Sequence, residues 1–128
     1  MTLVVDASAI AAIIFGEPNG TTVAAHLEDE SLVAPELIDY ELANIAWKKI
    51  RRHPTQHLQV TAAISVMKRM QITRLPVPID EVLSLAVDTG LSAYDASYLW
   101  LAMSRDIELV TLDSELARIN QVLREGPP

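Results

Sequence analysis

Two short apolar runs, each followed by an aspartate, constrain the fold of this chain more than any other feature. Leu3-Val4-Val5 ends at Asp6, and a second run at residues 108–111 is followed by Asp113. Strands that are apolar along their length are typical of a parallel sheet covered by helices on both faces, because neither face then meets water. The two runs therefore predict buried strands of an α/β protein, with an acid close to the carboxyl end of each.

Helical patterns separate the predicted strands. Helices are predicted over residues 7–15, 19–29, 35–52, from Pro54 to about 71, 79–88, 92–105 and 114–123, with a weak strand over 32–34 and a tail at 126–128. Pro35 is expected to open the third helix, since proline is favoured in a first turn. Two prolines within residues 75–78 suit an edge strand or an extended connection. This alternation predicts a three-layer α/β/α domain with a mainly parallel sheet.

Composition bounds the class of protein. The 128 residues are 50% hydrophobic, which suffices for one core and predicts a single domain over residues 1–128. A net charge of -7 argues against a surface that binds nucleic acid over its whole extent. The lack of cysteine excludes disulfides and thiolate metal sites. No stretch predicts a membrane span or a signal peptide, so we expect a cytoplasmic protein.

Four acids occupy positions where a solvated charge is not expected. Asp6 and Asp113 follow the two best strands, at the sheet edge where α/β proteins bind ligands. Helical spacing places Glu41 and Asp95 on inward, apolar helix faces. No cation lies one turn away from either acid on those faces, and Lys48 stands at the far edge of the first helix. We therefore expect these carboxylates to lie close together without a basic partner.

Carboxylates gathered in this way need a cation. An ionised carboxylate at a semi-buried site costs several kcal/mol unless it is paired or binds a metal, and repulsion among the acids raises their pKa values. Oxygen ligands without cysteine favour Mg²⁺ or Mn²⁺ over Zn²⁺. Such an ion can activate a water molecule and stabilise charge on a phosphoryl group. The four acids thus predict a metal site suited to phosphodiester hydrolysis.

Each acid also has a structural interpretation. Asp6 and Asp113 stand where N-caps of the following helices are expected, and Ser92 with Asp95 fits a capping box. Glu41 has no capping role, because it lies inside a helical pattern. The structural interpretation requires four separate coincidences, whereas one metal site explains all four positions.

Four segments of the chain resemble the PIN-domain ribonucleases, and among them the VapC-type toxins of bacterial and archaeal toxin-antitoxin pairs. They cover almost the whole chain in the order and rough spacing of that family and read Val4-Val5-Asp6-Ala7-Ser8-Ala9, Glu41-Leu42-Ala43-Asn44, Leu91-Ser92-Ala93-Tyr94-Asp95-Ala96-Ser97-Tyr98 and Leu109-Val110-Thr111-Leu112-Asp113. The resemblance implies a PIN-like fold and a Mg²⁺- or Mn²⁺-dependent endoribonuclease. The catalytic and metal-binding acids it implies are Asp6, Glu41, Asp95 and Asp113.

The resemblance also implies partners and further site residues. Ser8 and Thr111 fall where the family often has hydroxyl groups near the metal, although turn chemistry at strand ends explains them equally well. Glu115 is a further candidate ligand. RNA and a cognate VapB-type antitoxin are the expected partners. The antitoxin is expected to lay an amphipathic helix near Tyr40 or Trp47 and to place an arginine among the carboxylates.

Two surface features of the helix predicted over residues 35–52 bear on these partners. A second apolar face predicts either a homodimer interface, which is common in the family, or burial by the next helix; it consists of Tyr40, Ala43, Trp47 and Ile50. A basic cluster near the end of the helix either complements its C-terminus or contacts RNA phosphates; it consists of Lys48, Lys49, Arg51 and Arg52.

The alternative to a nuclease is a phospho-acceptor receiver domain, which has a similar length, alternating strands and helices, and an acidic Mg²⁺ pocket. That fold needs a lysine after a late strand and an acceptor aspartate after a central strand. Here Asp113 occupies the place of the lysine, and no acid follows a convincing third strand. Labelling by a phosphodonor, compared with metal-dependent cleavage of RNA, separates the two hypotheses.

Overall fold

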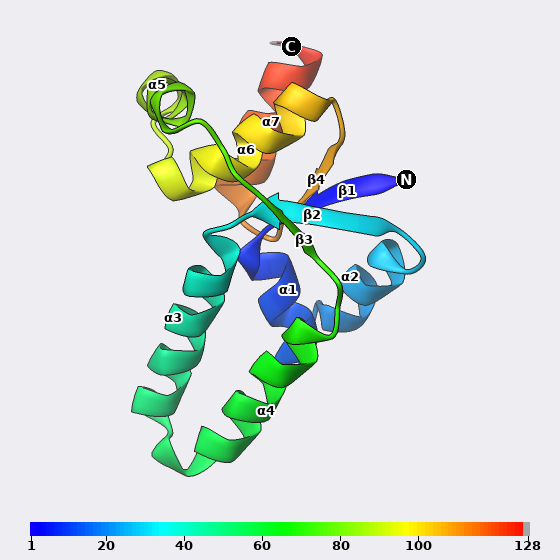
Figure 1. The fold of residues 1–128 in the computed structure, drawn as a ribbon, viewed down its shortest axis with the longest axis vertical. Helices are drawn as coiled ribbons and strands as arrows, with labels where there is room; N and C mark the ends of the chain where they lie inside the picture. Colours follow the sequence, from blue (N-terminus) through cyan, green and yellow to red (C-terminus); the bar gives the residue numbers. More distant parts are fainter. Residues whose placement is uncertain (127–128) are drawn as a thin grey trace.

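A sheet of four parallel strands forms the centre of the computed structural model, which describes residues 1–126 (Figure 1). The strand order is β3-β2-β1-β4, with β1 at Thr2–Val5, β2 at Ser31–Pro35, β3 at Thr73–Leu75 and β4 at Glu108–Val110. β1 pairs with β2 on one side and with β4 on the other. The two runs predicted to be buried strands, β1 and β4, are therefore neighbours, and their carboxyl ends lie at the same edge.

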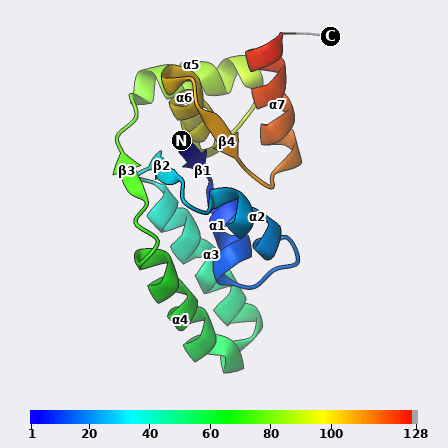
Figure 2. The ribbon, with the colours of Figure 1, turned by 90° about the vertical axis from the view of Figure 1, so that its right-hand side faces the viewer.

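Helices cover both faces of this sheet, α1 to α4 on one and α5 to α7 on the other (Figures 1 and 2). Within residues 1–126 their bounds are α1 Ala7–Ile14, α2 Gly20–Leu27, α3 Ile38–Arg52, α4 His57–Lys68, α5 Ile79–Thr89, α6 Ala93–Arg105 and α7 Ser114–Glu125, with a short 3-10 turn, η1, at Pro54–Gln56. The predicted three-layer α/β/α architecture is confirmed. No helix in this part of the chain is long and apolar enough to cross a membrane.

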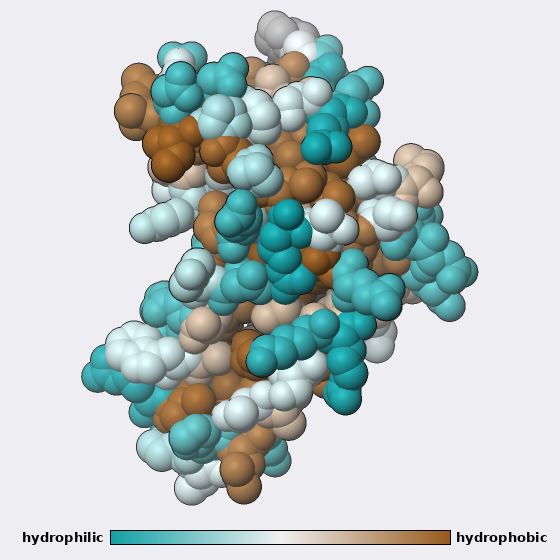
Figure 3. Space-filling model, in the orientation of Figure 1, coloured by the Kyte–Doolittle hydropathy of each residue, from teal (hydrophilic) through white to brown (hydrophobic). Residues whose placement is uncertain are grey.

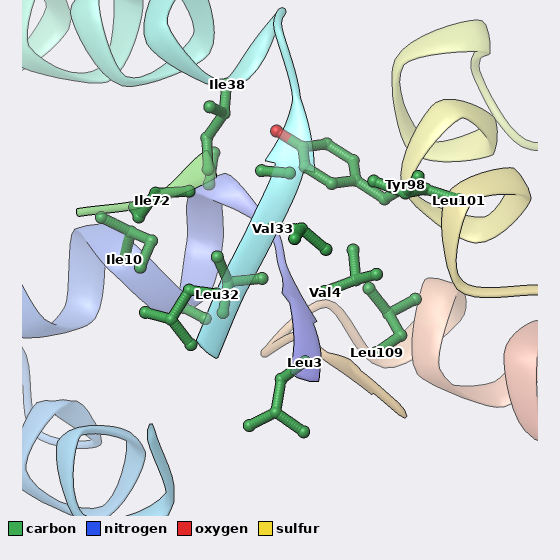
Figure 4. Close-up of a cluster of buried hydrophobic side chains, with 14 of the residues drawn as sticks. Leu3, Val4, Ile10, Leu32, Val33, Ile38, Ile72, Tyr98, Leu101 and Leu109 are labelled. Atoms are coloured by element: carbon green, nitrogen blue, oxygen red, sulfur yellow. The ribbon is translucent and has the colours of Figure 1, made fainter. Parts of the chain in front are cut away.

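The core fills the space between the sheet and both helical layers. Figure 4 shows Val4 and Leu109 on the side of Leu101 from α6, and Leu32 on the side of Ile10 from α1. All five side chains are buried. Burying one such side chain contributes roughly 1.5–3 kcal/mol to folding. Because each central strand packs on both faces, its carboxyl end is held firmly where the functional residues begin.

Two differences from the predicted boundaries have a clear local cause, while the other helix ends lie within about two residues of the prediction. Pro35 does not open a helix; it is the buried last residue of β2, paired with Leu75 of β3, and α3 begins at Ile38. Pro35 has no N–H to donate, and the ladder to β3 continues through the Glu36 N–H, which donates to the Leu75 carbonyl. α4 ends at Lys68, before Gln71, whose φ of 55° is incompatible with a continued helix.

The segment with two prolines forms the second of the two predicted structures, an extended connection, and an edge strand ends where it begins. β3 covers Thr73–Leu75 at the edge of the sheet, and the prolines follow as an extended connection to α5. Of the tail expected at residues 126–128, Pro127 and Pro128 lie outside the described residues.

Candidate functional site

Asp6 lies directly after β1 and is held by three hydrogen bonds. Its side chain is almost completely buried, and Oδ1 accepts from the Ser8 hydroxyl at 2.7 Å and from the Ala9 N–H at 3.0 Å. Oδ2 accepts from the hydroxyl of Thr111, which follows β4. A carboxylate has about four acceptor positions, so these bonds leave one lone pair free on Oδ2. Asp6 is thus an N-cap, as its structural interpretation requires, and still has capacity for a cation.

Thr111 connects Asp6 to the second aspartate of the sheet edge. Besides donating to Asp6, its hydroxyl oxygen accepts from the N–H of Asp113 at 3.0 Å. Asp113 caps α7 by accepting from the Leu116 N–H at 2.9 Å through Oδ1. Its other oxygen, Oδ2, has no protein hydrogen-bond partner within residues 1–126, and both Asp113 and Glu115 are exposed.

Glu41 projects from the first turn of α3 and is oriented by a tyrosine from the opposite helical layer. The hydroxyl of Tyr98 in α6 donates to Glu41 Oε1 at 2.6 Å. Tyr98 is only 1% exposed, and burial together with Glu41 raises its pKa, which keeps the phenol protonated as a donor. One oxygen of the half-buried Glu41 carboxylate is therefore fixed, and the other accepts no protein hydrogen bond within residues 1–126.

Asp95 lies in the first turn of α6, next to the N-cap. The Ser92 hydroxyl oxygen accepts from the Asp95 N–H at 3.1 Å, which is one half of the predicted capping box. The other half is missing among the described residues, because the Asp95 carboxylate accepts no protein hydrogen bond there. Capping accounts for the backbone of Asp95 and leaves its partly buried side chain without a structural role.

The four predicted acids lie within one another's electrostatic field. Burial is the main cause that raises the pKa values of Asp6, Glu41 and Asp95 above their ordinary range. Repulsion adds to each rise, from Asp113 on Asp6, from Asp95 on Glu41, and from Asp113 and Glu115 on Asp95. Within residues 1–126 none of these carboxylates forms an ion pair with a basic side chain. The structure therefore brings the predicted residues into one uncompensated acidic region.

The chemistry of this donor set fits a hard divalent cation. All candidate ligands are carboxylate oxygens, and hydrogen bonds orient Asp6 and Glu41 while leaving oxygen capacity on each. In the described part of the chain, no three Asp, Glu or His side chains are already arranged as a metal-binding group.

The fold and the order of these residues match a known family over nearly the whole chain. The family profile described as "PIN domain" matches residues 3–122. The chain belongs to the PIN-domain family. Among its relatives, exonuclease VapC9 of Pyrobaculum aerophilum is 36% identical over 118 residues, covering 88% of this chain and 80% of the relative. Ribonuclease VapC9 of Mycobacterium tuberculosis is 32% identical over 119 residues, covering 93% of this chain and 91% of the relative.

Solved structures share the PIN fold found here. PAE2754 from Pyrobaculum aerophilum superimposes with a TM-score of 0.71 at 33% identity, covering 91% of this PIN domain and 82% of that chain. Mycobacterium tuberculosis VapC20, described as a sarcin-ricin loop cleaving toxin, superimposes with a TM-score of 0.66 at 16% identity. The match covers 91% of this chain and 94% of that chain. The second similarity concerns the fold alone. Family membership decides against the receiver-domain alternative.

Sequence reasoning missed one residue of this PIN domain's site. Tyr98 belongs to one of the four segments that resemble the family, but no role was predicted for it. It follows Asp95 by three residues and so shares its helix face, which could have indicated a position near the site. Ser8 and Thr111 were singled out, and the structure places both hydroxyls against Asp6.

Proposed function

We propose that this PIN domain is a divalent-metal-dependent endoribonuclease in which Asp6, Glu41, Asp95 and Asp113 hold Mg²⁺ or Mn²⁺. One observation carries the proposal. Asp6 is a buried carboxylate without a cationic partner in residues 1–126, and it shares its acidic surroundings with three further acids from three other elements. Its three hydrogen bonds compensate a buried charge of this kind only in part, and a bound cation would supply the rest.

The chain's own residues have separable tasks in this proposal. Ser8 and Thr111 hold the Asp6 carboxylate in one orientation, and Tyr98 does the same for Glu41. Asp95 and Asp113 add negative charge from the exposed side, where substrate enters. A bound Mg²⁺ or Mn²⁺ supplies water activation and charge neutralisation at the phosphate. No covalent nucleophile is required.

The relatives' names support RNA as the substrate, but they differ on whether cleavage is internal or proceeds from an end. The Mycobacterium tuberculosis relative is named a ribonuclease, and one Pyrobaculum relative is named an exonuclease. We favour internal cleavage, in keeping with the expectation from the sequence. A circular single-stranded RNA is the discriminating substrate, because an exonuclease has no end to attack.

The experiment measures cleavage of circular RNA with Mg²⁺ or Mn²⁺, with EDTA, and with variants of the acids. We expect linear products with either ion and none in EDTA. Glu41→Gln and Asp95→Asn are expected to lower the rate by at least two orders of magnitude with folding retained. Asp88→Asn, an exposed aspartate at the end of α5, is the matched control and should cleave like the wild type.

Three outcomes contradict the proposal. Cleavage that persists in EDTA excludes a requirement for a metal ion. Full activity of both Glu41→Gln and Asp95→Asn excludes the four acids as the catalytic site. Degradation of linear RNA with circular RNA left intact makes the protein an exonuclease. Circular dichroism of each variant shows whether a lost activity reflects chemistry or unfolding.

The second apolar face of α3 is open in the single chain. Tyr40 and Trp47 are 79% and 51% exposed, Ala43 is exposed and Ile50 is partly buried, so α4 does not cover this face. We propose that it contributes to a homodimer. A cognate VapB-type antitoxin remains the proposed inhibitory partner, because the acidic region can accept an inserted arginine in place of a cation.

A further inference from the structure

Tyr98 joins the helices that carry Asp95 and Glu41. It lies three residues after Asp95 on α6 and is 1% exposed, and its ring lies beside β2 with the hydroxyl on the side of α3 (Figure 4). The hydroxyl donates to Glu41 Oε1 at 2.6 Å. The N–H of Ala7, the residue after Asp6, acts on the same hydroxyl as a hydrogen-bond donor. One buried phenol therefore connects α1, α3 and α6, the helices next to three of the acids.

Protein donors already occupy one oxygen of Asp6 completely and one oxygen of Glu41 in part. Oδ1 of Asp6 accepts from the Ser8 hydroxyl and from the Ala9 N–H, which uses both of its lone pairs. Asp6 therefore offers a cation only the remaining lone pair of Oδ2. Oε1 of Glu41 is held by Tyr98, and water cannot take over this bond because the phenol is buried. The oxygen of Glu41 that stays free for a cation is Oε2.

This pattern of free oxygens distinguishes between divalent cations. Ca²⁺ takes about six to eight oxygen ligands and often binds both oxygens of one carboxylate. Mg²⁺ keeps a strict octahedron, retains several waters and needs only one or two carboxylates. A hollow of about 420 Å³ borders Glu41, where the surface is indented between α3 and α6 (Figure 3), and it leaves room for such waters. Carboxylates restricted to one oxygen each therefore favour Mg²⁺.

We propose that Tyr98 and Ser8 are positioning residues that determine the metal selectivity of the site. By occupying oxygens of Glu41 and Asp6, they limit each acid to one oxygen for the cation and disfavour Ca²⁺ relative to Mg²⁺. This selectivity rests on the proposed nuclease function, whose cation it specifies. Tyr98 is buried and acts only through Glu41, so it takes no part in the chemistry.

The test measures metal binding without RNA. The electron paramagnetic resonance signal of free Mn²⁺ reports binding to the protein, and Mg²⁺ and Ca²⁺ are added as competitors. Tyr98→Phe should lower the affinity for Mg²⁺ roughly 10- to 100-fold, the range for losing a group that orients a metal ligand. The affinity for Ca²⁺ should fall less, because Ca²⁺ can then use both oxygens of Glu41. The preference for Mg²⁺ over Ca²⁺ should therefore shrink by roughly tenfold.

Two further variants separate selectivity from a general loss of structure. Ser8→Ala frees a lone pair on Asp6 Oδ1 and should shift the preference toward Ca²⁺ in the same way, so it decides the matter if Tyr98→Phe does not fold. Tyr94→Phe, which removes an exposed hydroxyl from the same helix, is the matched control and should keep both affinities. Circular dichroism of each variant reports its folding.

The outcomes distinguish this proposal from the nuclease proposal. Equal losses of Mg²⁺ and Ca²⁺ affinity in Tyr98→Phe show a merely structural role and overturn the selectivity, as does an unchanged preference in a folded Ser8→Ala. A wild type that prefers Ca²⁺ to Mg²⁺ also overturns it, while Mn²⁺ binding itself leaves the proposed metal site intact. A wild type that binds no Mn²⁺ overturns both proposals together.

Discussion

Replacing Thr111 with valine tests whether the hydroxyl holds Asp6 as a charged group. Valine keeps the shape of threonine and removes the donor to Asp6 Oδ2. Asp6 is 4% exposed, so water cannot readily replace that donor. A hydrogen bond to a charged group contributes roughly 1.5–3 kcal/mol. The N–H of Asp113 also loses its acceptor, but this group is exposed and can bind water. We therefore expect a loss of about 2 kcal/mol at pH 7.5 from the one buried bond.

The loss should depend on pH in a defined direction. Burial already raises the pKa of Asp6, the Thr111 bond opposes that rise, and Thr111→Val therefore raises the pKa further. The full loss is present above the variant's raised pKa. As the pH falls through that value the variant gains a proton that the wild type still lacks, and the two stabilities converge.

Urea denaturation in EDTA at pH 7.5 and pH 4.5 measures both effects. Thr22→Val, an exposed threonine of α2, is the matched control and should change stability little at either pH. An unchanged stability of Thr111→Val at pH 7.5 would show that the bond does not stabilise charged Asp6. A loss of the same size at both pH values would refute the electrostatic reasoning.

Four further predictions follow from the same structure. Asp95→Asn should stabilise the protein slightly in EDTA at pH 7.5, because the raised pKa of Asp95 penalises the folded state above that pKa and solvent screens the effect at this partly exposed site; the gain should vanish at low pH, and a destabilised variant contradicts it. Gly20→Ala should cost roughly 1–3 kcal/mol in thermal unfolding, since its Cβ would lie 2.3 Å from the Ala12 carbonyl oxygen; the exposed control Thr21→Ala should not. Sedimentation at tens of micromolar should show a dimer that Trp47→Asp dissociates, and a monomeric wild type excludes it. Co-expression with the neighbouring small open reading frame should rescue growth and yield a complex. Equal toxicity with and without that reading frame would exclude its product as the antitoxin.

Much of the fold could be predicted because its strands are short and apolar. The continuous apolar run Leu3-Val4-Val5 indicates a strand buried on both faces. The helices between the strands are indicated by the helical spacing of their apolar residues. Pro35 was assigned wrongly because the local preference of proline for a first helical turn competes with its tolerance at a strand end. Only the pairing with Leu75, 40 residues away in sequence, decides between them. The order of the strands likewise depends on contacts between distant segments.

The acids of the candidate site could be proposed from the sequence, whereas the groups that orient these acids could not all be recognised. An acid at a strand end or inside an apolar helix face is visible in the sequence, which is how Asp6 and Glu41 were found. The bond from Tyr98 to Glu41 joins residues 57 apart and depends on how α3 and α6 approach each other across the sheet edge. Asp6 caps α1 and still keeps a free lone pair, so its capping role does not exclude the proposed metal site.

The most direct measurement is anomalous diffraction from a crystal of the wild-type protein soaked with Mn²⁺. It tests whether the acidic residues form a metal site, on which the proposed chemistry depends. We expect anomalous density in contact with Asp6 and with at least two of Glu41, Asp95 and Asp113. Density confined to other parts of the surface, or none at a Mn²⁺ concentration that supports RNA cleavage, would contradict the account.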